Sequence, residues 1–562
     1  MALSSSVPGE EIYRIAIGQG MYSSELPSNI PDGFSSICYN LVATGDSLEN
    51  RIGIKRPTLD WKYGEASPGA DSFVDTEYYF CHIDPWSKDA SKPAFMWSGK
   101  GYILPALTAS GNTLNAVRAE GTHDANDGFM SCSIPNPCTG IAQYNGVTYF
   151  ILNTVGVQKI TVFNWATDTI TYTQVASSAG ATMRGLFTFK DRLWAWNKHN
   201  LYFTNVASVT NPLPETWALA SNVIPFAGPN GYGDIKQIVP LGNRLAVFTT
   251  NGLFTLLVEG EPASWIMRIL DSKSICTTSR TAFESKGIIY YINSQGVWAT
   301  NTQTVTKLSA VIDDQWFLAK GARIHTICAY EDGMIASIAK QSTTNGRYFD
   351  KDNCKVFYSK LDPIGWTEWN INQYEASGGR PDRYAFMWST TDKIPTYLNA
   401  EPSVYIMGMI TDSTQAANTY GVMQVLIMDG GSDEYVDRSN TLRTSPVGIY
   451  LKTKHFDGGN PYSIKRAKQG MLEIFTSDAN HVFTTSWDLD ETIDSASEVE
   501  EVNIQERTVG VGSNLVRIRN QIYYRRAAMN VRTTLQSDTS QIKIKDIAIA
   551  QDTGRGEFEI VR

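Results

Sequence analysis

The stretch that decides the fold is Ile238–Leu257, IVPLGNRLAVFTTNGLFTLL, in which three apolar runs are separated by Gly242-Asn243 and by Asn251-Gly252. Gly and Asn tolerate the positive φ angles that two-residue hairpins require, so the stretch predicts three antiparallel strands. The same frame occurs in four more copies, whose starts lie 45, 52, 44 and 46 residues apart along the chain. They are Ile141–Ile160, Leu186–Asn205, Ala282–Asn301, and Cys328–Ala339 continued at Lys355–Tyr358.

Every copy has an apolar strand between two turns. The first turns are Asn145-Gly146, Lys190-Asp191, Gly242-Asn243, Lys286-Gly287 and Asp332-Gly333, and the second turns lie at Gly156, Asn200, Gly252 and Gly296. Three or four strands in about 45 residues is the size of a β-propeller blade, and a single blade cannot bury both of its faces. We therefore expect the copies to pack radially as sequential blades.

Two further stretches with alternating apolar residues, Tyr78–Leu104 and Tyr384–Met409, are candidates for additional blades. With them the sequence predicts a propeller of six or seven blades. The WD40 and kelch signatures are absent, because the one Trp-Asp pair, Trp487-Asp488, lies outside the array and Gly-Gly does not recur once per repeat. A stack of β-sandwiches with chance similarity is the alternative.

Helix periodicity is nearly absent, so the fold class is all-β. We expect three parts: a loop-like N-terminal platform segment at 1–60, the propeller at 61–430, and a C-terminal β-rich platform domain at 431–562. The platform is then formed by both chain ends. Its expected strands are Val447–Lys452, Gln469–Phe475, Val482–Ser486, Gln521–Arg526 and Gln541–Ile549.

Composition excludes several classes of protein. The 562 residues carry a net charge of −9, which argues against a wide surface that grips nucleic acid. No apolar stretch reaches the roughly 20 residues of a membrane span, and the N-terminus shows no signal-peptide pattern. The seven Cys are scattered and odd in number, so we expect seven free thiols in a protein folded in a reducing cytosol.

Motifs that would support catalysis or metal binding fail. The chain has no G-x-S-x-G elbow, no P-loop and no H-E-x-x-H, and its six His are not at metal-ligand spacing. Cys132 and Cys138 lie six apart without a C-x-x-C pair, and Asp488-Leu489-Asp490 lacks the Gly and the distal Glu of a calcium loop. We therefore predict no enzyme, and no catalytic, cofactor-binding or metal-binding residues.

A propeller that binds or hydrolyses glycans is the rival hypothesis. Glycosidases need two placed carboxylates, for which Asp313-Asp314 can be nominated. The sialidase Asp-box is not met, because Asn293–Trp298 lacks the Asp. Trp366 and Trp369 could stack on sugars, although we expect them to pack in the core. The Arg side chains that could bind a substrate carboxylate are Arg51, Arg184 and Arg280.

A resemblance to one family rests on several strings taken in order: Pro31–Phe34, Asn40-Leu41, Leu48–Gly53 (LENRIG), Leu241–Leu257 (LGNRLAVFTTNGLFTLL) and Gly287–Trp298. Together they resemble the tail nozzle proteins of short-tailed bacteriophages, also called stabilisation proteins or tubular tail protein B. The resemblance touches most of the chain diffusely, and the chain lacks an obvious long inserted domain for spike docking.

The resemblance implies a structural virion protein of the viral tail. It implies a homo-hexamer below the portal and its adaptor, the head-to-tail connector, assembled in the host cytoplasm, with tail fibres or spikes as possible partners. Double-stranded DNA would pass through the lumen without specific binding, and the ring would serve genome retention and ejection. The family has no catalytic residues to carry over.

Charge leads to three more expectations. The face lining the ring axis should be neutral to acidic, so that DNA slides instead of binding. The acidic stretch 488–501 should form a solvated loop, and a basic cluster should face a protein neighbour; it consists of Lys452, Lys454, Lys465, Arg466 and Lys468.

Deleting residues 1–60 should leave a folded propeller that no longer joins the particle, because platform strands expose edges that neighbours can cover.

Overall fold

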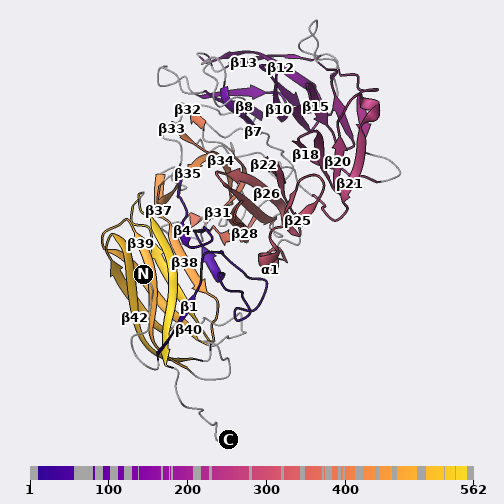
Figure 1. Cartoon of the computed structure of the whole chain (residues 1–562). Helices are drawn as coiled ribbons and strands as arrows, with labels where there is room; N and C mark the ends of the chain where they lie inside the picture. The colour runs from indigo at the N-terminus through magenta and orange to yellow at the C-terminus, as the bar shows by residue number, and fades with distance from the viewer. Residues whose placement is uncertain are drawn as a thin grey trace.

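The computed structural model describes residues 10–552 with gaps, and the fold is all-β (Figure 1). The longer gaps are 56–79, 83–92, 101–111, 119–128, 207–216, 342–348, 374–381, 412–421, 458–464 and 490–501. Helical structure in the described ranges is limited to α1 (Asp313–Phe317) and the 3₁₀ turns η2 (Pro262–Ser264) and η3 (Ala310–Ile312). In the described ranges we find no helix with the length and apolarity to cross a membrane.

The five sequence repeats form five successive sheets, each of four antiparallel strands in chain order. The second blade consists of β10 (Cys138–Tyr144), β11 (Val147–Leu152), β12 (Gly156–Asn164) and β13 (Thr169–Gln174), and the third of β14 (Gly185–Phe189), β15 (Arg192–Trp196), β16 (Asn200–Phe203) and β17 (Val223–Pro225). The fourth consists of β18 (Ile235–Leu241), β19 (Arg244–Thr249), β20 (Gly252–Leu257) and β21 (Ile266–Asp271), and the fifth of β22 (Ala282–Ser285), β23 (Ile288–Asn293), β24 (Gly296–Thr300) and β25 (Val305–Lys307). The sixth consists of β26 (Ala322–Tyr330), β27 (Gly333–Gln341), β28 (Phe349–Lys360) and β29 (Thr367–Glu368). The repeat frame in the sequence is therefore the blade of the structure.

Both additional stretches also form blades, which confirms that prediction. The first blade consists of β6 (Phe80–His82), β7 (Pro93–Lys100), β8 (Asn112–Arg118) and β9 (Phe129–Ile134). The seventh consists of β30 (Asn372–Gln373), β31 (Asp382–Ser389), β34 (Tyr405–Thr411) and β35 (Val422–Met428), with the hairpin β32 (Ile394–Thr396) and β33 (Asn399–Ser403) between β31 and β34. The described residues thus hold seven blades of a β-propeller.

The first turn of each repeat is a two-residue hairpin. Tyr144 pairs with Val147 and Ser285 with Ile288, so each turn has two residues between the paired positions. In the first of these turns Asn145 and Gly146 have φ angles of 48° and 75°. In the last repeat the predicted position is wrong by one residue: Tyr330 pairs with Gly333, and Glu331 has a φ of 50°. Gly333 starts the next strand, and a Cβ at this position would lie 2.5 Å from the Tyr358 hydroxyl oxygen.

Consecutive blades share hydrophobic cores, as a propeller requires. Phe150 of the second blade packs with Leu114 of the first, and Leu193 of the third packs with Ile151 of the second. The same pattern continues along the chain with Trp194 and Leu245, with Phe248 and Tyr291, and with Ile292 and Ile327. Each apolar strand is therefore buried on both faces, which explains the continuous apolar runs in the repeats.

Gln237 of β18 joins the fourth and fifth blades through its side-chain amide. Its Oε1 accepts hydrogen bonds from the backbone N–H groups of Thr281 (2.6 Å) and Ala282 (3.0 Å), and its Nε2 donates to the Ala282 carbonyl (2.7 Å). Replacement by Ala should lower the free energy of unfolding by about 1–3 kcal/mol, because these backbone groups lose their partner. Thermal and denaturant unfolding would measure the loss. The exposed Gln303 provides the control, and an equal effect of Gln303→Ala would contradict the assignment.

The platform is a two-layered sandwich at the other end of the molecule (Figure 1). One sheet, the outer sheet, has the strand order β3 (Leu41–Ala43), β4 (Leu48–Asn50), β44 (Ile542–Asp552), β39 (Lys465–Thr476), β42 (Gly512–Tyr524), with β1 (Glu10–Ile15) also paired to β44. The facing sheet contains β2 (Ser35–Tyr39), β38 (Gly448–Thr453), β43 (Ala527–Thr534), β40 (His481–Leu489) and β41 (Val502–Val509). Their common core includes Leu451, Leu472 and Trp487.

The expectation that the N-terminal segment is loop-like is wrong for residues 10–55. Besides β1 to β4 it contains β5 (Ile54–Lys55), which pairs with β35 at the edge of the seventh blade. Most of these strands have only two to six residues and are separated by Gly and Pro, so they show too few alternations for a period to be recognised. The boundaries expected at residues 60 and 430 stay a prediction.

The cysteines in the described part agree with the expected thiol state. Cys38, Cys276 and Cys328 are buried free thiols, and burial raises the pKa of Cys276 and of Cys328 to about 12. Cys132 and Cys138 are thiols as well, so no bridge joins them. The side chains of Cys81 and Cys354 lie outside the described part, and for these two the expectation stays a prediction.

Candidate functional site: the neck between propeller and platform

The neck, defined here as residues 39–55 with Trp369 and Asp433, is where the propeller and the platform meet. One nine-stranded sheet crosses it, in the order β26-β27-β28-β29-β2-β38-β43-β40-β41. The crossing point is the parallel pair of Tyr39 in β2 with Glu368 in β29. The sixth blade and the facing sheet of the platform are therefore one continuous hydrogen-bonded surface.

A buried ion pair lies at the centre of the neck. The Arg51 guanidinium donates to both carboxylate oxygens of Asp433, at 2.8 and 2.6 Å, and the Arg51 side chain is fully buried. Asp433 belongs to the hairpin β36 (Ser432–Val436) and β37 (Leu442–Pro446), and its Oδ1 also accepts from the backbone N–H of Ile54 at 3.1 Å. The bidentate geometry fixes the N-terminal segment against this hairpin.

Two more donors of Arg51 have acceptors within the neck. Its Nε donates to Asn40 Oδ1 at 2.8 Å and its Nη1 to the Ile52 carbonyl at 3.0 Å, and Asn40 in turn donates to the Gly448 carbonyl at 2.6 Å. The guanidinium also lies over the Trp369 ring, 5.9 Å from its centroid. Gly53 leaves the backbone room to pass, because a Cβ at this position would lie 2.1 Å from the Ser432 carbonyl oxygen. The LENRIG string thus contains the residues that lock the neck.

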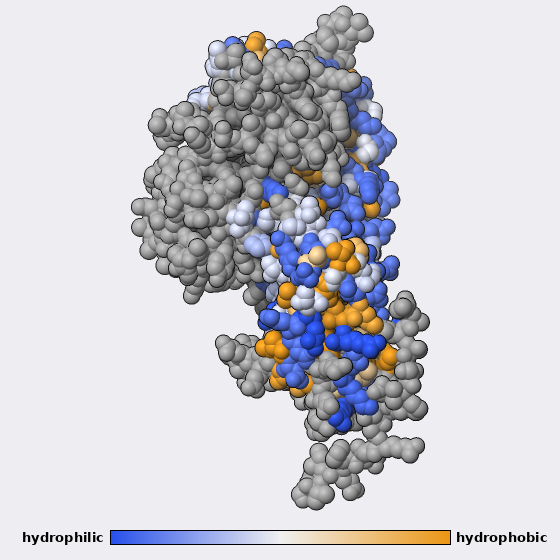
Figure 2. All heavy atoms as spheres, turned by 90° about the vertical axis from the view of Figure 1, so that its left-hand side faces the viewer, coloured by the Kyte–Doolittle hydropathy of each residue, from blue (hydrophilic) through white to orange (hydrophobic). Residues whose placement is uncertain are grey.

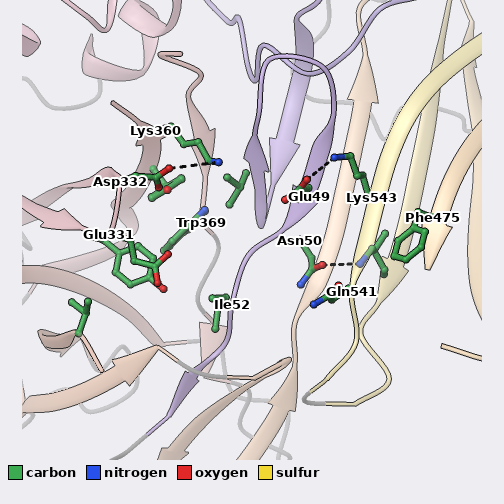
Figure 3. A pocket seen from close by; sticks show the side chains of 15 residues that line it. Glu49, Asn50, Ile52, Glu331, Asp332, Lys360, Trp369, Phe475, Gln541 and Lys543 are labelled. Carbon is green, nitrogen blue, oxygen red and sulfur yellow. Dashed lines mark hydrogen bonds and ion pairs between the residues drawn. The ribbon is translucent and has the colours of Figure 1, made fainter. Parts of the chain in front are cut away.

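A cleft of about 800 Å³, here called the neck cleft, opens between the two halves (Figure 3). On the propeller side it is lined by Glu331, Asp332, Lys360 and Trp369, and on the platform side by Phe475, Gln541 and Lys543. The strand with Glu49, Asn50 and Ile52 runs between them. Four of its charges form two ion pairs: Lys543 lies 2.8 Å from Glu49, and Lys360 lies 3.7 Å from Asp332.

The structure describes most of the residues nominated for sugar chemistry, and several of them have partners elsewhere in the chain. Asp313 and Asp314 begin the short helix α1, where Asp313 pairs with Lys307 at 2.5 Å and Asp314 accepts from Ser23 at 2.5 Å. Arg51 is occupied by Asp433 in the neck, Arg184 lies in the loop before β14, and Arg280 lies outside the described residues. Arg51 is therefore held by a carboxylate outside the nominated Asp313-Asp314 pair.

Trp366 and Trp369 are core residues, as expected. Their exposed fractions are 0% and 2%, and each indole N–H donates to a backbone carbonyl, of Leu308 and of Leu41 respectively. Trp369 also stacks on Tyr358, with ring centroids 4.5 Å apart. In the described residues no group of three or more His, Cys, Asp or Glu side chains is placed to hold a metal ion.

The basic cluster and the acidic stretch are partly corrected. Lys452 pairs with Asp488 and Lys454 pairs with Asp32. The acidic partners of these two lysines therefore lie in the same chain, not in a neighbouring protein as expected. Asp488 lies near the end of β40, where it pairs with Ala528 of β43, and it is buried, so it is not part of a solvated loop. Residues 490–501 lie outside the described part, and their expected role stays a prediction.

Asp488 should make the platform sensitive to acid. Burial raises the pKa of its carboxyl, but hydrogen bonds and charge from His455 and Lys452 outweigh that effect and hold the pKa below its ordinary value. A lowered pKa in the folded state adds stability above the unfolded pKa, near 3.9, that is lost as the pH falls through the folded pKa. Asp488→Asn should therefore be less stable at neutral pH and lose less stability on acidification.

Urea unfolding at neutral pH and at a series of acidic pH values would measure this difference. Asp191→Asn, at an exposed hairpin turn where Asn fits the positive φ, is the matched control and should follow the wild type at every pH. Parallel curves for Asp488→Asn and the wild type would contradict the assignment.

Sequence reasoning missed Asp433 and Phe475, which complete the neck and its cleft. Asp433 follows Gly430-Gly431 in a stretch of ordinary loop composition, and Phe475 ends an expected strand without any sign of its neighbours. A buried Arg needs an acidic partner, so the Arg in the LENRIG string was the one signal in the sequence that such a partner exists. The chain holds 57 acidic residues, so the partner could not be chosen without the fold.

Comparisons with known proteins give similarity of fold alone. No protein-family model matches the chain, and no curated protein matches it. Among solved structures, the N-terminal domain of Nup159 is 8% identical with a TM-score of 0.30, over 57% of this chain and 87% of that one. The extracellular domain of the putative one-component system BT4673 from B. thetaiotaomicron is 10% identical with a TM-score of 0.36, over 92% and 62%. YCF48 bound to D1 peptide is 10% identical with a TM-score of 0.33, over 66% and 98%.

Proposed function

We propose that this chain is a structural virion protein that forms the tail nozzle ring of a short-tailed phage. The observation that supports the proposal is the neck. The LENRIG string, one of those that resemble the nozzle family, supplies the Arg51 that joins the N-terminal segment to the Asp433 hairpin through a bidentate, buried ion pair. A buried, bidentate ion pair fixes the orientation of the two segments, and a tail part needs a fixed shape when DNA passes through it.

The construction of the two halves is consistent with this role. Both chain ends interleave in the platform, since β1 and β4 pair with β44, and the platform sheet continues into the sixth blade. Propeller and platform therefore form one elongated body (Figure 1). In the proposed assembly six such bodies stand side by side below the adaptor, in the virion tail.

The proposed ring would let double-stranded DNA pass during ejection without binding it specifically. The net charge of −9 per chain favours a lumen that repels phosphates. Purified protein should not retain duplex DNA at physiological salt. Tight binding with a steep salt dependence would contradict a conduit that lets DNA slide.

Stoichiometry and position in the particle test the proposed function directly. The chain should copurify with virions in the ratio of a hexamer, and electron microscopy of labelled particles should place it in the tail below the adaptor. Its absence from purified virions would overturn the proposal. A purified chain that binds or degrades host polysaccharide would instead favour the rival, a glycan-binding or glycan-hydrolysing tail protein.

A further inference from the structure

The turn between β41 and β42, Gly510-Val511-Gly512, presents an apolar tip to solvent. Val511 is 66% exposed, the highest value among the large hydrophobic side chains of the described residues. The Asn514 side chain donates to the carbonyls of Gly510 at 2.6 Å and Gly512 at 2.8 Å, and Gly512 has a φ of 97°. These hydrogen bonds hold the turn in one shape, so Val511 is a pre-organised apolar knob.

The lining of the neck cleft contains both apolar and charged side chains. Ile52 is 37% exposed there, and Val42 and Phe475 are half-buried. The charged lining consists of three carboxylates, of Glu49, Glu331 and Asp332, and two ammonium groups, of Lys360 and Lys543. Figure 3 shows these side chains on both walls of the opening. A small uncharged side chain can therefore bury apolar surface in this cleft without separating the Lys543–Glu49 and Lys360–Asp332 ion pairs.

The knob and the cleft lie at the same height of the molecule. Gly512 pairs with Thr476, and Thr476 pairs with Ile542, which lines the cleft, so the three residues form one cross-strand row. The tip lies at the start of β42, and the cleft lies beside β4 and β44 of the same sheet. From β42 to β4 there are three strand spacings, or about 14 Å. On one face of the platform hydrophobic patches remain uncovered, as Figure 2 shows.

We infer that Val511 of one copy of this chain seats in the neck cleft of the next copy. Two different surfaces at one height give a head-to-tail contact, which generates a ring when its rotation closes. The occupant is a second copy because the chain itself provides the matching knob, of fitting polarity, at the matching height. Strand addition at the neighbouring edge is disfavoured, since β41 includes Asn503 at a positive φ of 54°, which interrupts the regular ladder. This inference rests on the proposed ring.

Engineered disulfides test the contact in the full-length chain. Val511→Cys with Ile52→Cys should give a ladder of covalent oligomers under mild oxidation. A mixture of the two single variants should give dimers and nothing larger, because each chain then carries one half of the contact. Val511→Cys with Val162→Cys, on an exposed position of β12, is the control and should give no ladder above the wild type.

Charge substitution gives a second readout of the same contact. The cleft lining has one more carboxylate than ammonium group, so Val511→Glu should weaken self-association more than Val511→Lys, measured by sedimentation. Changing Glu331 and Asp332 to Lys should reverse that order. Equal effects of the two substitutions would overturn the assignment of the cleft.

The outcomes separate this inference from the proposed function. Rings without a Val511–Ile52 crosslink would overturn the contact and leave the nozzle role standing. Crosslinked open chains that never close would support the contact and contradict the ring. Dimers of the Val511→Cys single variant would show a two-fold contact and overturn the head-to-tail arrangement. A chain that stays monomeric at the highest concentration in which it remains dissolved would also overturn the contact, while virion stoichiometry decides the role.

Discussion

Replacing Arg51 by Met should lower the free energy of unfolding by about 3–5 kcal/mol, because the Asp433 carboxylate is left buried without its partner. The change also removes the donor to Asn40 and the contact with Trp369. Since this set of contacts closes the neck, the platform and the seventh blade should both lose protection. Denaturant unfolding would measure the loss, and hydrogen exchange would locate it.

Two matched variants make the Arg51 prediction specific. Lys198→Met breaks an ion pair whose side chains are 51% and 26% exposed, and it should cost no more than about 1 kcal/mol. Adding Asp433→Leu to Arg51→Met should recover part of the loss, because the uncompensated carboxylate is then gone. An Arg51→Met variant as stable as Lys198→Met would show that the neck does not depend on the ion pair.

Removing residues 1–55 should abolish cooperative folding of the platform and expose the sixth blade. The deletion takes β1, β3 and β4 from one platform sheet, β2 from the centre of the nine-stranded sheet, and β5 from the seventh blade. It also removes Cys38, Leu41 and Leu48, each with an exposed fraction of 0%. The sequence alone led to a different expectation, namely that deletion of residues 1–60 leaves a folded propeller. The contacts of β2 and β5 with two blades now predict that the propeller is affected as well.

Circular dichroism, dye binding and limited proteolysis would report the effect of the deletion. The shortened chain should bind a hydrophobic dye and be cleaved rapidly after residue 430, in the part that forms the platform sheets. Leu26→Ser, which changes an exposed side chain of the same segment, is the control and should leave the stability nearly unchanged. A soluble 56–562 fragment with one sharp unfolding transition would refute the prediction.

The repeats could be found in the sequence because their signal is local. A two-residue turn such as Asn145-Gly146 and the apolar runs on each side of it are neighbours in the chain, and the φ angles that the turn needs select its residues. Five repeats then supported each other, so the blades of the propeller were predictable. The strands β2 to β5 were not, because two to five residues contain too few alternations to show a period.

The sequence by itself determined the all-β class, the blade repeat and the burial of Trp366 and Trp369, since each depends on residue types and spacings within a few positions. Only the tertiary structure decided that Arg51 meets Asp433, that Lys452 meets Asp488, and that the Val511 tip stands level with the neck cleft. Arg51 and Asp433 are 382 residues apart in the chain. Any carboxylate can pair with a guanidinium, so the composition does not indicate which one pairs with Arg51. The choice among them is made by the paths of strands that pair across the whole chain, and strand pairing at long range has no local signal.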